Sequence, residues 1–208
     1  MGFYGDKILP RITNVTLRGR EFEELRALAT SGLDGEVLEV GFGTGLNVPH
    51  YPAEVTRVRA VDPATEGRKL AAGRVAASKV PVEYVDATGT TLPLLDASVD
   101  HALCTWTLCT IPDVAGALAE VRRVLRPGGL FHFVEHGLSP DPKVARMQHR
   151  LTPLQRLVLG GCHLDRPIDT LITDAGFELV RLENRYMQGP RVYGYTFEGV
   201  AAAPRDAA

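Results

Sequence analysis

The stretch 37–45 contains the residues of this chain whose types and spacing say most about chemistry. An apolar run with one acid, Glu39, leads into glycines at positions 41, 43 and 45. Glycine is needed where a backbone turns at positive φ or lets a ligand come close, because a Cβ would block both. A second apolar run, 58–61, ends in Asp62. A glycine loop after one strand and an acid at the tip of the next predict an adenosine site, with the carboxylate on the ribose hydroxyls.

The glycine spacing also bears on which adenosine cofactor binds. A dinucleotide loop has a further glycine where this chain has Leu46, and Pro49 and Pro52 shorten the helix that would cradle a pyrophosphate. S-adenosylmethionine (SAM) carries no phosphate and needs no such cradle. The acid-x-Gly-x-Gly-x-Gly pattern resembles motif I of class I SAM-dependent methyltransferases, and the likeness extends over about residues 33–135, with 121–129 resembling the region before the fifth strand of many small-molecule methyltransferases.

The resemblance implies a set of cofactor-binding residues and their roles. Glu39 would orient the loop or contact the amino acid part of SAM, Asp62 would accept from the ribose, and Asp86 would bind the adenine amino group. Trp106 would lie on the methionine side of the cofactor. The open alternatives are a helix cap for Asp62, a turn cap for Asp86 and a core position for Trp106. The full implied set is Glu39, Gly41, Phe42, Gly43, Thr44, Gly45, Asn47, Asp62, Pro63, Asp86, Ala87, Cys104, Thr105 and Trp106.

Two later segments resemble one subgroup of these enzymes. Glu135-His136 and the stretch 160–166 are similar to segments of the animal microsomal alkyl thiol methyltransferases, and bacterial phospholipid headgroup N-methyltransferases share the core motifs. The animal proteins carry an N-terminal membrane anchor, which we do not expect in residues 1–13 of this chain. Many relatives have a histidine soon after the fourth strand, but this chain reads Leu-Cys-Thr-Ile-Pro-Asp at 108–113, so no histidine role is expected there.

Methyl transfer is a direct displacement, so an enzyme mainly aligns the acceptor with the methyl group and excludes water. A general base is needed only when the acceptor must lose a proton. We expect His136 to fill that role, followed by His163 and Asp165, with structural hydrogen bonding as the alternative for the two histidines. Cys162 is expected to pack. No metal is expected, because Cys162, His163 and His136 lack a fourth ligand.

Composition places the chain among ordinary globular enzymes. It has 208 residues, 45% of them hydrophobic, and a net charge of −2, so a single domain that does not bind nucleic acid is expected. Three cysteines without a zinc-like pair favour a reducing, cytoplasmic setting. The run 143–158 combines an apolar stripe with basic residues, which predicts a solvated face or, alternatively, peripheral contact with a membrane. A monomer or homodimer is expected.

The elements that must position these residues follow from hydrophobic periodicity. We expect strands at 36–40, 57–61, 81–85, 99–105 and 130–134, and helices at 20–29, 65–77 and 113–125. Two short helices should meet at Thr152, and runs 177–186 and 192–200 should form a hairpin around 188–190. The alternation predicts an α/β fold with a mostly parallel sheet, and the resemblance implies seven strands in the order 3-2-1-4-5-7-6.

The predicted methyltransferase domain spans 1–200 and contains two special segments, with a tail after it. Residues 1–32 should form an N-terminal helix and lid, with Phe3, Tyr4, Ile8, Leu9 and Ile12 either over the acceptor or in the core. Residues 137–168 should form a helical insertion on the substrate side, and 201–208 a disordered tail.

The sequence therefore predicts a SAM-dependent methyltransferase acting on a small, fairly lipophilic acceptor such as a thiol. Three rivals stay open: methylation of a phospholipid headgroup, a nicotinamide oxidoreductase, and a protein that binds SAM without catalysis.

Overall fold

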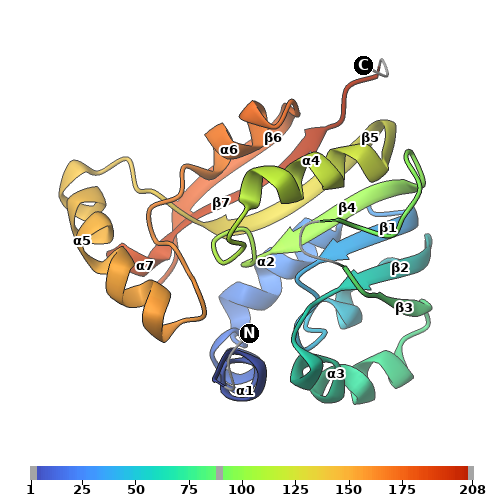
Figure 1. Ribbon diagram of the computed structural model, residues 1–208, viewed down its shortest axis with the longest axis horizontal. Helices are drawn as coiled ribbons and strands as arrows, with labels where there is room; N and C mark the ends of the chain where they lie inside the picture. The colour runs from blue at the N-terminus through green and yellow to red at the C-terminus, as the bar shows by residue number, and fades with distance from the viewer. Residues whose placement is uncertain (1–3, 88–90, 206–208) are drawn as a thin grey trace.

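The strands form one mixed sheet (Figure 1). Within residues 4–87 and 91–205, which the computed structural model describes, seven strands run in the order β3-β2-β1-β4-β5-β7-β6. All neighbours are parallel except β7, which runs antiparallel to both β5 and β6. The predicted order and the predicted C-terminal hairpin are both confirmed. The strands are β1 (Gly35–Val40), β2 (Val55–Val61), β3 (Val82–Val85), β4 (Val99–Thr105), β5 (Leu125–His136), β6 (Glu178–Tyr186) and β7 (Tyr195–Ala202).

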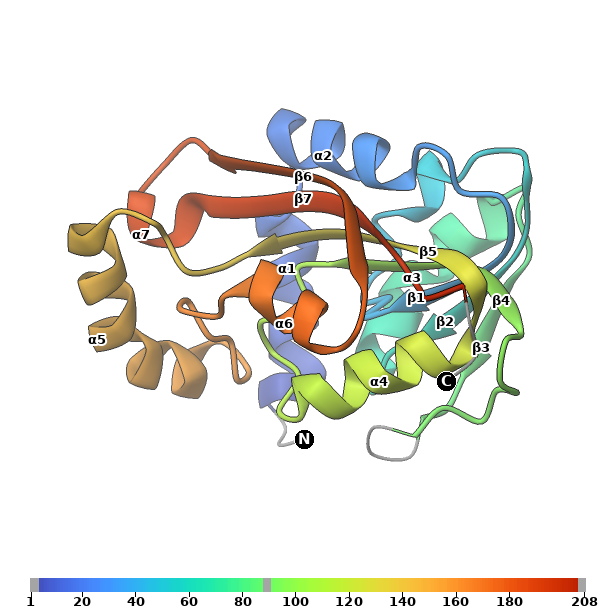
Figure 2. The same ribbon diagram turned by 90° about the horizontal axis from the view of Figure 1, so that it is seen from above.

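Helices cover both faces of this sheet (Figure 2). The view from above shows α2 on one face and α4 and α6 on the other, with α5 beyond the end of the sheet. In the described part of the chain the helices are η1 (Tyr4–Ile8), α1 (Leu9–Thr16), α2 (Arg20–Thr30), η2 (Val48–His50), α3 (Thr65–Ala77), α4 (Val114–Val124), α5 (Pro142–Val158), α6 (Ile168–Asp174) and α7 (Arg191–Gly194). None of these helices has the length and apolar character that crossing a membrane requires.

Alternation along each strand divides the core into two layers. Val37 packs in the cluster with α2, whereas its neighbour Leu38 packs in the cluster with α4 and α6. Successive side chains of a strand point to opposite faces, so a strand with helices on both sides is apolar throughout. Both side chains are fully buried, as are Phe131 and Phe133 on β5. The buried strand β1 therefore holds the glycine loop that follows it on a rigid support.

The region after β5 differs from the prediction. The predicted break between two helices at Thr152 was wrong, because α5 is one continuous helix that contains Pro153. Pro153 is exposed, so the helix carbonyl that loses its donor can face water. The helix is also anchored at Gln148, whose side-chain amide donates to the Gly137 carbonyl over 2.9 Å and accepts from the Ser139 N–H over 2.9 Å.

The last strand of the final hairpin also begins and ends later than predicted. A helical turn, α7, occupies residues that we assigned to the start of the last strand, and β7 then continues to Ala202. Ala201 and Ala203 are buried, so the predicted disordered tail is wrong at its start. The strand persists because Leu130 on β5 pairs with Ala202. Residues 206–208 of that tail lie outside the described residues.

Candidate active site

The glycine loop follows β1 and is fixed by backbone hydrogen bonds to the neighbouring strand. The N–H groups of Gly41 and Phe42 both donate to the Val61 carbonyl, over 2.8 and 3.1 Å. Gly41 has φ +78°, and a Cβ there would overlap the Thr107 side chain. Gly43 has φ +54°, and a Cβ there would meet no heavy atom closer than 3.8 Å. The loop thus needs glycine for two reasons, close packing at Gly41 and a left-handed backbone beside open space at Gly43.

Asp62, at the tip of β2, organises the loop. One carboxylate oxygen accepts from the Gly43 N–H over 2.7 Å, and the other accepts from the Ala64 N–H over 2.7 Å. Burial raises the pKa of Asp62, and these two N–H donors oppose that rise. The carboxylate therefore braces the loop against the start of α3, and Asp62 also lines the cavity described next.

A cavity of about 980 Å³ lies where β1, β2, β3 and β4 end. It is lined by every residue of the predicted cofactor set except Glu39, Gly45 and Cys104. Glu39 and Cys104 are buried beneath it. Parallel strands bring their carboxyl ends to one edge of the sheet, which explains why segments far apart in the sequence meet here. Asp86 lies at the rim, mostly exposed, and pairs with Arg68.

A buried polar network supports the floor of this cavity. Asn47 donates to a Glu39 carboxylate oxygen over 2.9 Å and to the Thr105 hydroxyl over 3.0 Å. Arg26, from α2, donates to the Asn47 side-chain oxygen over 2.8 Å. Tyr51 donates to the second oxygen of Glu39. Thr105 and Asn47 line the cavity directly, so the network joins α2, β1 and β4 at the ligand surface.

Sequence reasoning missed two residues of this network, Tyr51 and Arg26. Of these two, Arg26 is the one at the cavity surface. It is 3% exposed, lines the cavity, and its guanidinium lies 4.8 Å from the centre of the Trp106 ring. Its Nε is buried with no hydrogen-bond partner among the described residues. Burial lowers the pKa of Arg26 to about 10 and raises that of Glu39 to about 7. A buried cation with an unpaired donor is suited to an anionic group on a ligand.

The opposite end of the cavity is mainly apolar. Its walls come from three regions: the start of the chain, the loop after β4, and the C-terminal part of α5 with the loop beyond it. The residues are Leu9, Pro10, Leu17, Thr110, Ile111, Pro112, Leu157, Gly160 and Gly161. Arg156 is exposed and provides a positive charge at this end. Such walls suit an apolar small molecule.

The candidate bases lie outside these walls. His136 Nε2 lies 3.1 Å from Cys162 Sγ, and neither residue lines the cavity. Asp165 contacts the ring of His149 over 2.8 Å and lies 4.0 Å from that of His163. Catalytic roles for His136, His163 and Asp165 therefore stay predictions.

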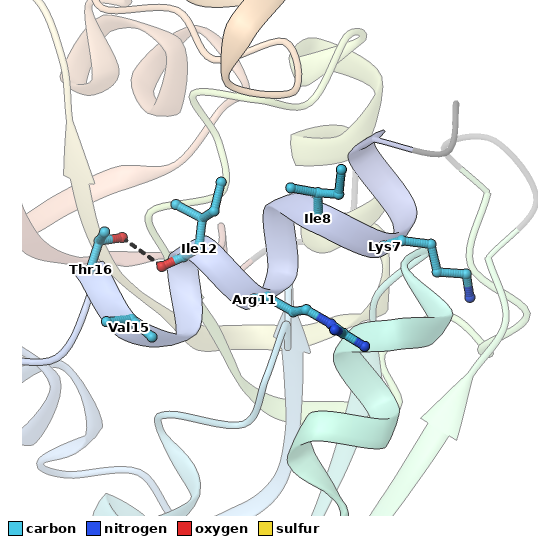
Figure 3. Close-up of a pocket in the computed structure, with 6 residues that line it drawn as sticks. All are labelled: Lys7, Ile8, Arg11, Ile12, Val15 and Thr16. Carbon is cyan, nitrogen blue, oxygen red and sulfur yellow. Dashed lines mark hydrogen bonds between the residues drawn. The ribbon is translucent and has the colours of Figure 1, made fainter.

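A second, more open hollow lies on the outer face of α1 (Figure 3). It is lined by Lys7, Ile8, Arg11, Ile12, Val15 and Thr16, and Figure 3 shows these side chains along one helix. Ile8, at the end of η1, and Ile12, in α1, thus lie on the outer side, contrary to the expected lid contact, whereas Leu9 faces the main cavity. Phe3 and the side chain of Tyr4 lie outside what the structure describes.

Sequence comparison with known proteins also indicates a methyltransferase. Residues 38–133 match the family described as "Methyltransferase domain". The chain is 33% identical over 184 residues to human Thiol S-methyltransferase TMT1A, covering 84% of this chain and 75% of that protein. The chain belongs to the class I SAM-dependent methyltransferases.

Two further relatives extend the comparison of this methyltransferase. Phosphatidylethanolamine N-methyltransferase of Cereibacter sphaeroides is 29% identical over 152 residues, covering 70% of this chain and 71% of that protein. A putative methyltransferase structure from Bacillus halodurans superposes with a TM-score of 0.69 at 20% identity, covering 89% of this chain and all of the other. The latter similarity concerns the fold alone.

The residues present fit SAM, which supplies a methyl group on a positively charged sulfonium. The open space at Gly43 gives a ligand access to the loop backbone, and Asp62 offers acceptor lone pairs. The unpaired Arg26 Nε and the buried Glu39 carboxyl match the opposite charges of an amino acid group. These four residues belong to the loop and the network below it, so one arrangement of β1, β2 and α2 supplies them all.

Proposed function

We propose that this methyltransferase transfers the methyl group of SAM to the sulfur of small lipophilic thiols. The observation that carries the proposal is the apolar end of the cavity, which is walled by Leu9, Ile111 and Leu157 and adjoins the loop that fits SAM. The printed activity of the human relative, thiol S-methylation, supports the same acceptor. Apolar walls stabilise an alkyl or aryl thiol at about 25 cal/mol for each Å² of apolar surface that leaves water.

The proposed roles in cofactor binding follow from the charges of the site. Arg26 would bind the carboxylate of SAM, Glu39 would compensate its ammonium charge through the Asn47 network, and Asp62 would accept from the ribose hydroxyls. Asp86, at the rim, would bind the adenine amino group. These roles are supported by charge and position: Arg26 and Glu39 are buried charged groups, and Asp62 and Asp86 are carboxylates that line the cavity.

A thiol acceptor also fits the lack of a histidine among the described residues that line the cavity. Thiols ionise near pH 8.5, so a fraction is already thiolate at neutral pH without a general base. The Arg156 cation at the acceptor end would favour the thiolate, modestly because it is exposed to water. The protein would then align sulfur and methyl group and exclude water, which is most of what a displacement requires.

The test is turnover with acceptors that differ only in the reacting atom. An alkyl thiol, the matching alcohol and the matching amine are incubated with protein and methyl-labelled SAM, and labelled products are measured by mass spectrometry. We expect labelled methyl thioether from the thiol, and at least tenfold less product from the other two. Equal or greater transfer to oxygen or nitrogen would contradict the proposal.

A second candidate is methylation of a phospholipid amine headgroup. It is favoured by the exposed apolar side chains of α5, with Leu154 60% and Leu157 82% exposed close to the acceptor end, and by the basic residues Arg150 and Arg156 on the same helix. Vesicles containing phosphatidylethanolamine, added to the same assay, separate the two candidates. Labelled lipid without labelled thioether would favour the headgroup.

The cellular setting is a separate part of the proposal. The cysteines of the described chain are buried and form no disulfide, which supports the proposal that the enzyme works in the reducing cytoplasm.

A further inference from the structure

Three side chains that can bind metals meet behind the acceptor end of the cavity. Cys109 comes from the loop after β4, His136 is the last residue of β5, and Cys162 lies in the loop after α5. His136 Nε2 lies 3.1 Å from Cys162 Sγ, and the two sulfurs are 3.8 Å apart. All three donor atoms lie within 4.8 Å of one another. The catalytic proposal above uses none of them.

The backbone holds the two cysteine loops against each other. The His163 N–H donates to the Cys109 carbonyl over 2.8 Å. Arg166 braces the same loop, because its guanidinium donates to the Ile111 carbonyl over 2.7 Å and to the Leu108 carbonyl. Cys109 is 2% and Cys162 7% exposed, so both sulfurs are held in a buried, preformed position.

We propose that Cys109, His136 and Cys162 form a binding site for a thiophilic divalent cation, with Zn²⁺ as the best fit. Zinc–sulfur bonds of about 2.3 Å in tetrahedral geometry place two thiolate sulfurs about 3.8 Å apart. The observed separation of 3.8 Å has that value. Imidazole nitrogen is a regular third ligand, and a water molecule can supply the fourth. Binding would release the thiol protons to solvent, so the ion would be held by two thiolates and one neutral imidazole.

This proposal replaces the expectation of no metal. The sequence offered Cys162, His136 and His163, which lack the required ligand pattern. In the structure, the third member of the cluster is Cys109, which is distant in the sequence, and not His163. The cluster therefore has two sulfurs and a ring nitrogen. No ligand spacing in the sequence indicates that combination, because Cys109 follows β4, His136 ends β5 and Cys162 follows α5.

Formal charges around the cluster favour a divalent ion. Glu135 is fully buried, and its Oε2 has no hydrogen-bond partner among the described residues. Once the ion has displaced the two thiol protons, the two thiolates and this carboxylate carry three negative charges, against one positive charge on Arg166. An ion of charge +2 would balance the set, and buried charges are tolerated when they are compensated.

The site lies directly behind one wall of the cavity. Gly160 and Gly161, which precede Cys162, and Thr110, which follows Cys109, all line the acceptor end. An ion held by both cysteines would fix these two walls relative to β5. We assign it a positioning role, independent of which acceptor the enzyme uses.

The direct test measures metal binding to the full chain. The protein is stripped with a chelator, kept reduced with a phosphine, and titrated with Co²⁺ and then with Zn²⁺. We expect one equivalent of each ion, a thiolate-to-cobalt charge-transfer band, and loss of that band when Zn²⁺ displaces Co²⁺. Zn²⁺ should also raise the melting temperature in a concentration-dependent manner.

Variants assign the ligands. Cys109→Ser, Cys162→Ser and His136→Ala should each weaken Zn²⁺ binding by about 100-fold or more, since loss of second-shell partners alone costs 10–100-fold. Cys104→Ser is the matched control, because Cys104 is also a buried free cysteine but does not belong to the cluster. It should retain one equivalent of Zn²⁺. Far-ultraviolet circular dichroism checks that each variant is folded.

Three results would overturn the proposal. The first is wild-type protein with reduced thiols that shows neither a cobalt band nor stoichiometric Zn²⁺. The second is a Cys104→Ser variant that loses as much affinity as Cys109→Ser. The third is a Cys109–Cys162 disulfide in peptide mapping of untreated protein, with no metal bound once it is reduced. None of these depends on turnover, so failure here is distinguishable from failure of the thiol assay.

Discussion

Glu39 is the residue whose ionisation should depend most on the cofactor. Its carboxyl is 1% exposed and accepts hydrogen bonds from Asn47 and Tyr51. Burial raises its pKa from 4.5 to about 7 because the charged form loses water, and the hydrogen bonds only partly offset this. Between those two pH values the folded state binds more protons than the unfolded state. This residue's contribution to stability therefore falls as the pH rises from 4.5 to 7.

SAM carries an ammonium and a sulfonium, so its binding should favour the ionised form of Glu39 and release a proton. We expect the affinity for SAM to rise about tenfold between pH 6 and pH 8. Glu39→Gln should bind more weakly and show a flatter profile, which separates Glu39 from titration of SAM itself. Calorimetry in two buffers of different ionisation enthalpy measures the proton release. Identical pH slopes for the two proteins would show that Glu39 is not linked to binding.

Asp62 has two tasks, bracing the loop and facing the cofactor. Asp62→Ala removes the acceptor of the Gly43 and Ala64 N–H groups and the proposed ribose acceptor. The affinity for SAM should fall by about 1–3 kcal/mol, the usual cost of leaving buried donors unpaired. Equilibrium dialysis with labelled SAM gives the affinity, and Asp100→Ala is a control acid outside the cavity. Unchanged affinity would remove Asp62 from the cofactor site.

The loop residues, and Glu39, Asn47 and Thr105 of the network below the loop, could be selected from the sequence, but Arg26 and Tyr51 could not. Glycines at alternate positions and an acid at the next strand's tip follow from local backbone requirements, which leave a readable spacing. Arg26 left no such signal, because it stands in an ordinary amphipathic helix beside the buried Leu25. Its role depends on Asn47 and Thr105, which only the folded chain brings near.

At the scale of elements, α1 forms a wall of the cavity and is attached to α3. Arg11 donates to Glu66 over 2.7 Å, and Lys7 lies 3.8 Å from the same carboxylate. The Arg11 guanidinium lowers the pKa of Glu66, as a salt bridge to a carboxylate should. The inner side of α1 meanwhile contributes Leu9, Pro10 and Thr13 to the cavity. Glu66 thus connects the placement of α1 to α3, the helix that follows Asp62.

Glu66→Gln should loosen this attachment without disturbing the sheet. We expect faster amide hydrogen exchange over residues 9–16, a raised KM for the acceptor and a largely unchanged melting temperature. Glu24→Gln is the matched control, since Glu24 pairs with Arg20 on the exposed surface of α2. Hydrogen exchange read by mass spectrometry decides the matter. Equal protection of α1 in both variants would mean that apolar packing, not the ion pair, holds it.

Element prediction succeeded where local pattern and tertiary context agree. The helix at 65–77 and the strand at 99–105 have the bounds that periodicity predicted. The break at Thr152 failed because proline and a capping pattern are local signals, whereas α5 is held by Gln148, whose partners lie in other segments. The prediction for the end of β7 failed for a similar reason. Alanine has little strand preference, and residues 201 and 202 are extended because they pair with β5.

The whole molecule forms one cavity at one edge of the sheet, and we propose that its two substrates lie there side by side. The proposed cofactor end of the cavity is built by loops after β1, β2, β3 and β4. The proposed acceptor end is built by α1, the loop after β4, and the end of α5 with the loop beyond it. Strand order and the cofactor could be predicted because a family pattern records them. For the acceptor end, the sequence predicted that segments 1–32 and 137–168 take part. It did not predict the contribution of the loop after β4, because these segments meet only in the folded chain.

The most direct test of this account compares two glycine substitutions that carry the same backbone strain. Gly43 and Gly32 both have positive φ, +54° and +81°, and a Cβ at either position would meet no protein atom within 3.4 Å. Gly43→Ala and Gly32→Ala should therefore each cost about 1–3 kcal/mol of stability. Only Gly43 lines the cavity.

The measurement is calorimetric binding of S-adenosylhomocysteine to the wild type and both variants. We predict tight binding by the wild type and by Gly32→Ala, and at least a hundredfold loss for Gly43→Ala, because the added methyl group would occupy the space that the cofactor needs. A Gly43→Ala protein that is folded and binds as tightly as Gly32→Ala would contradict the central claim that the glycine loop holds the methyl donor.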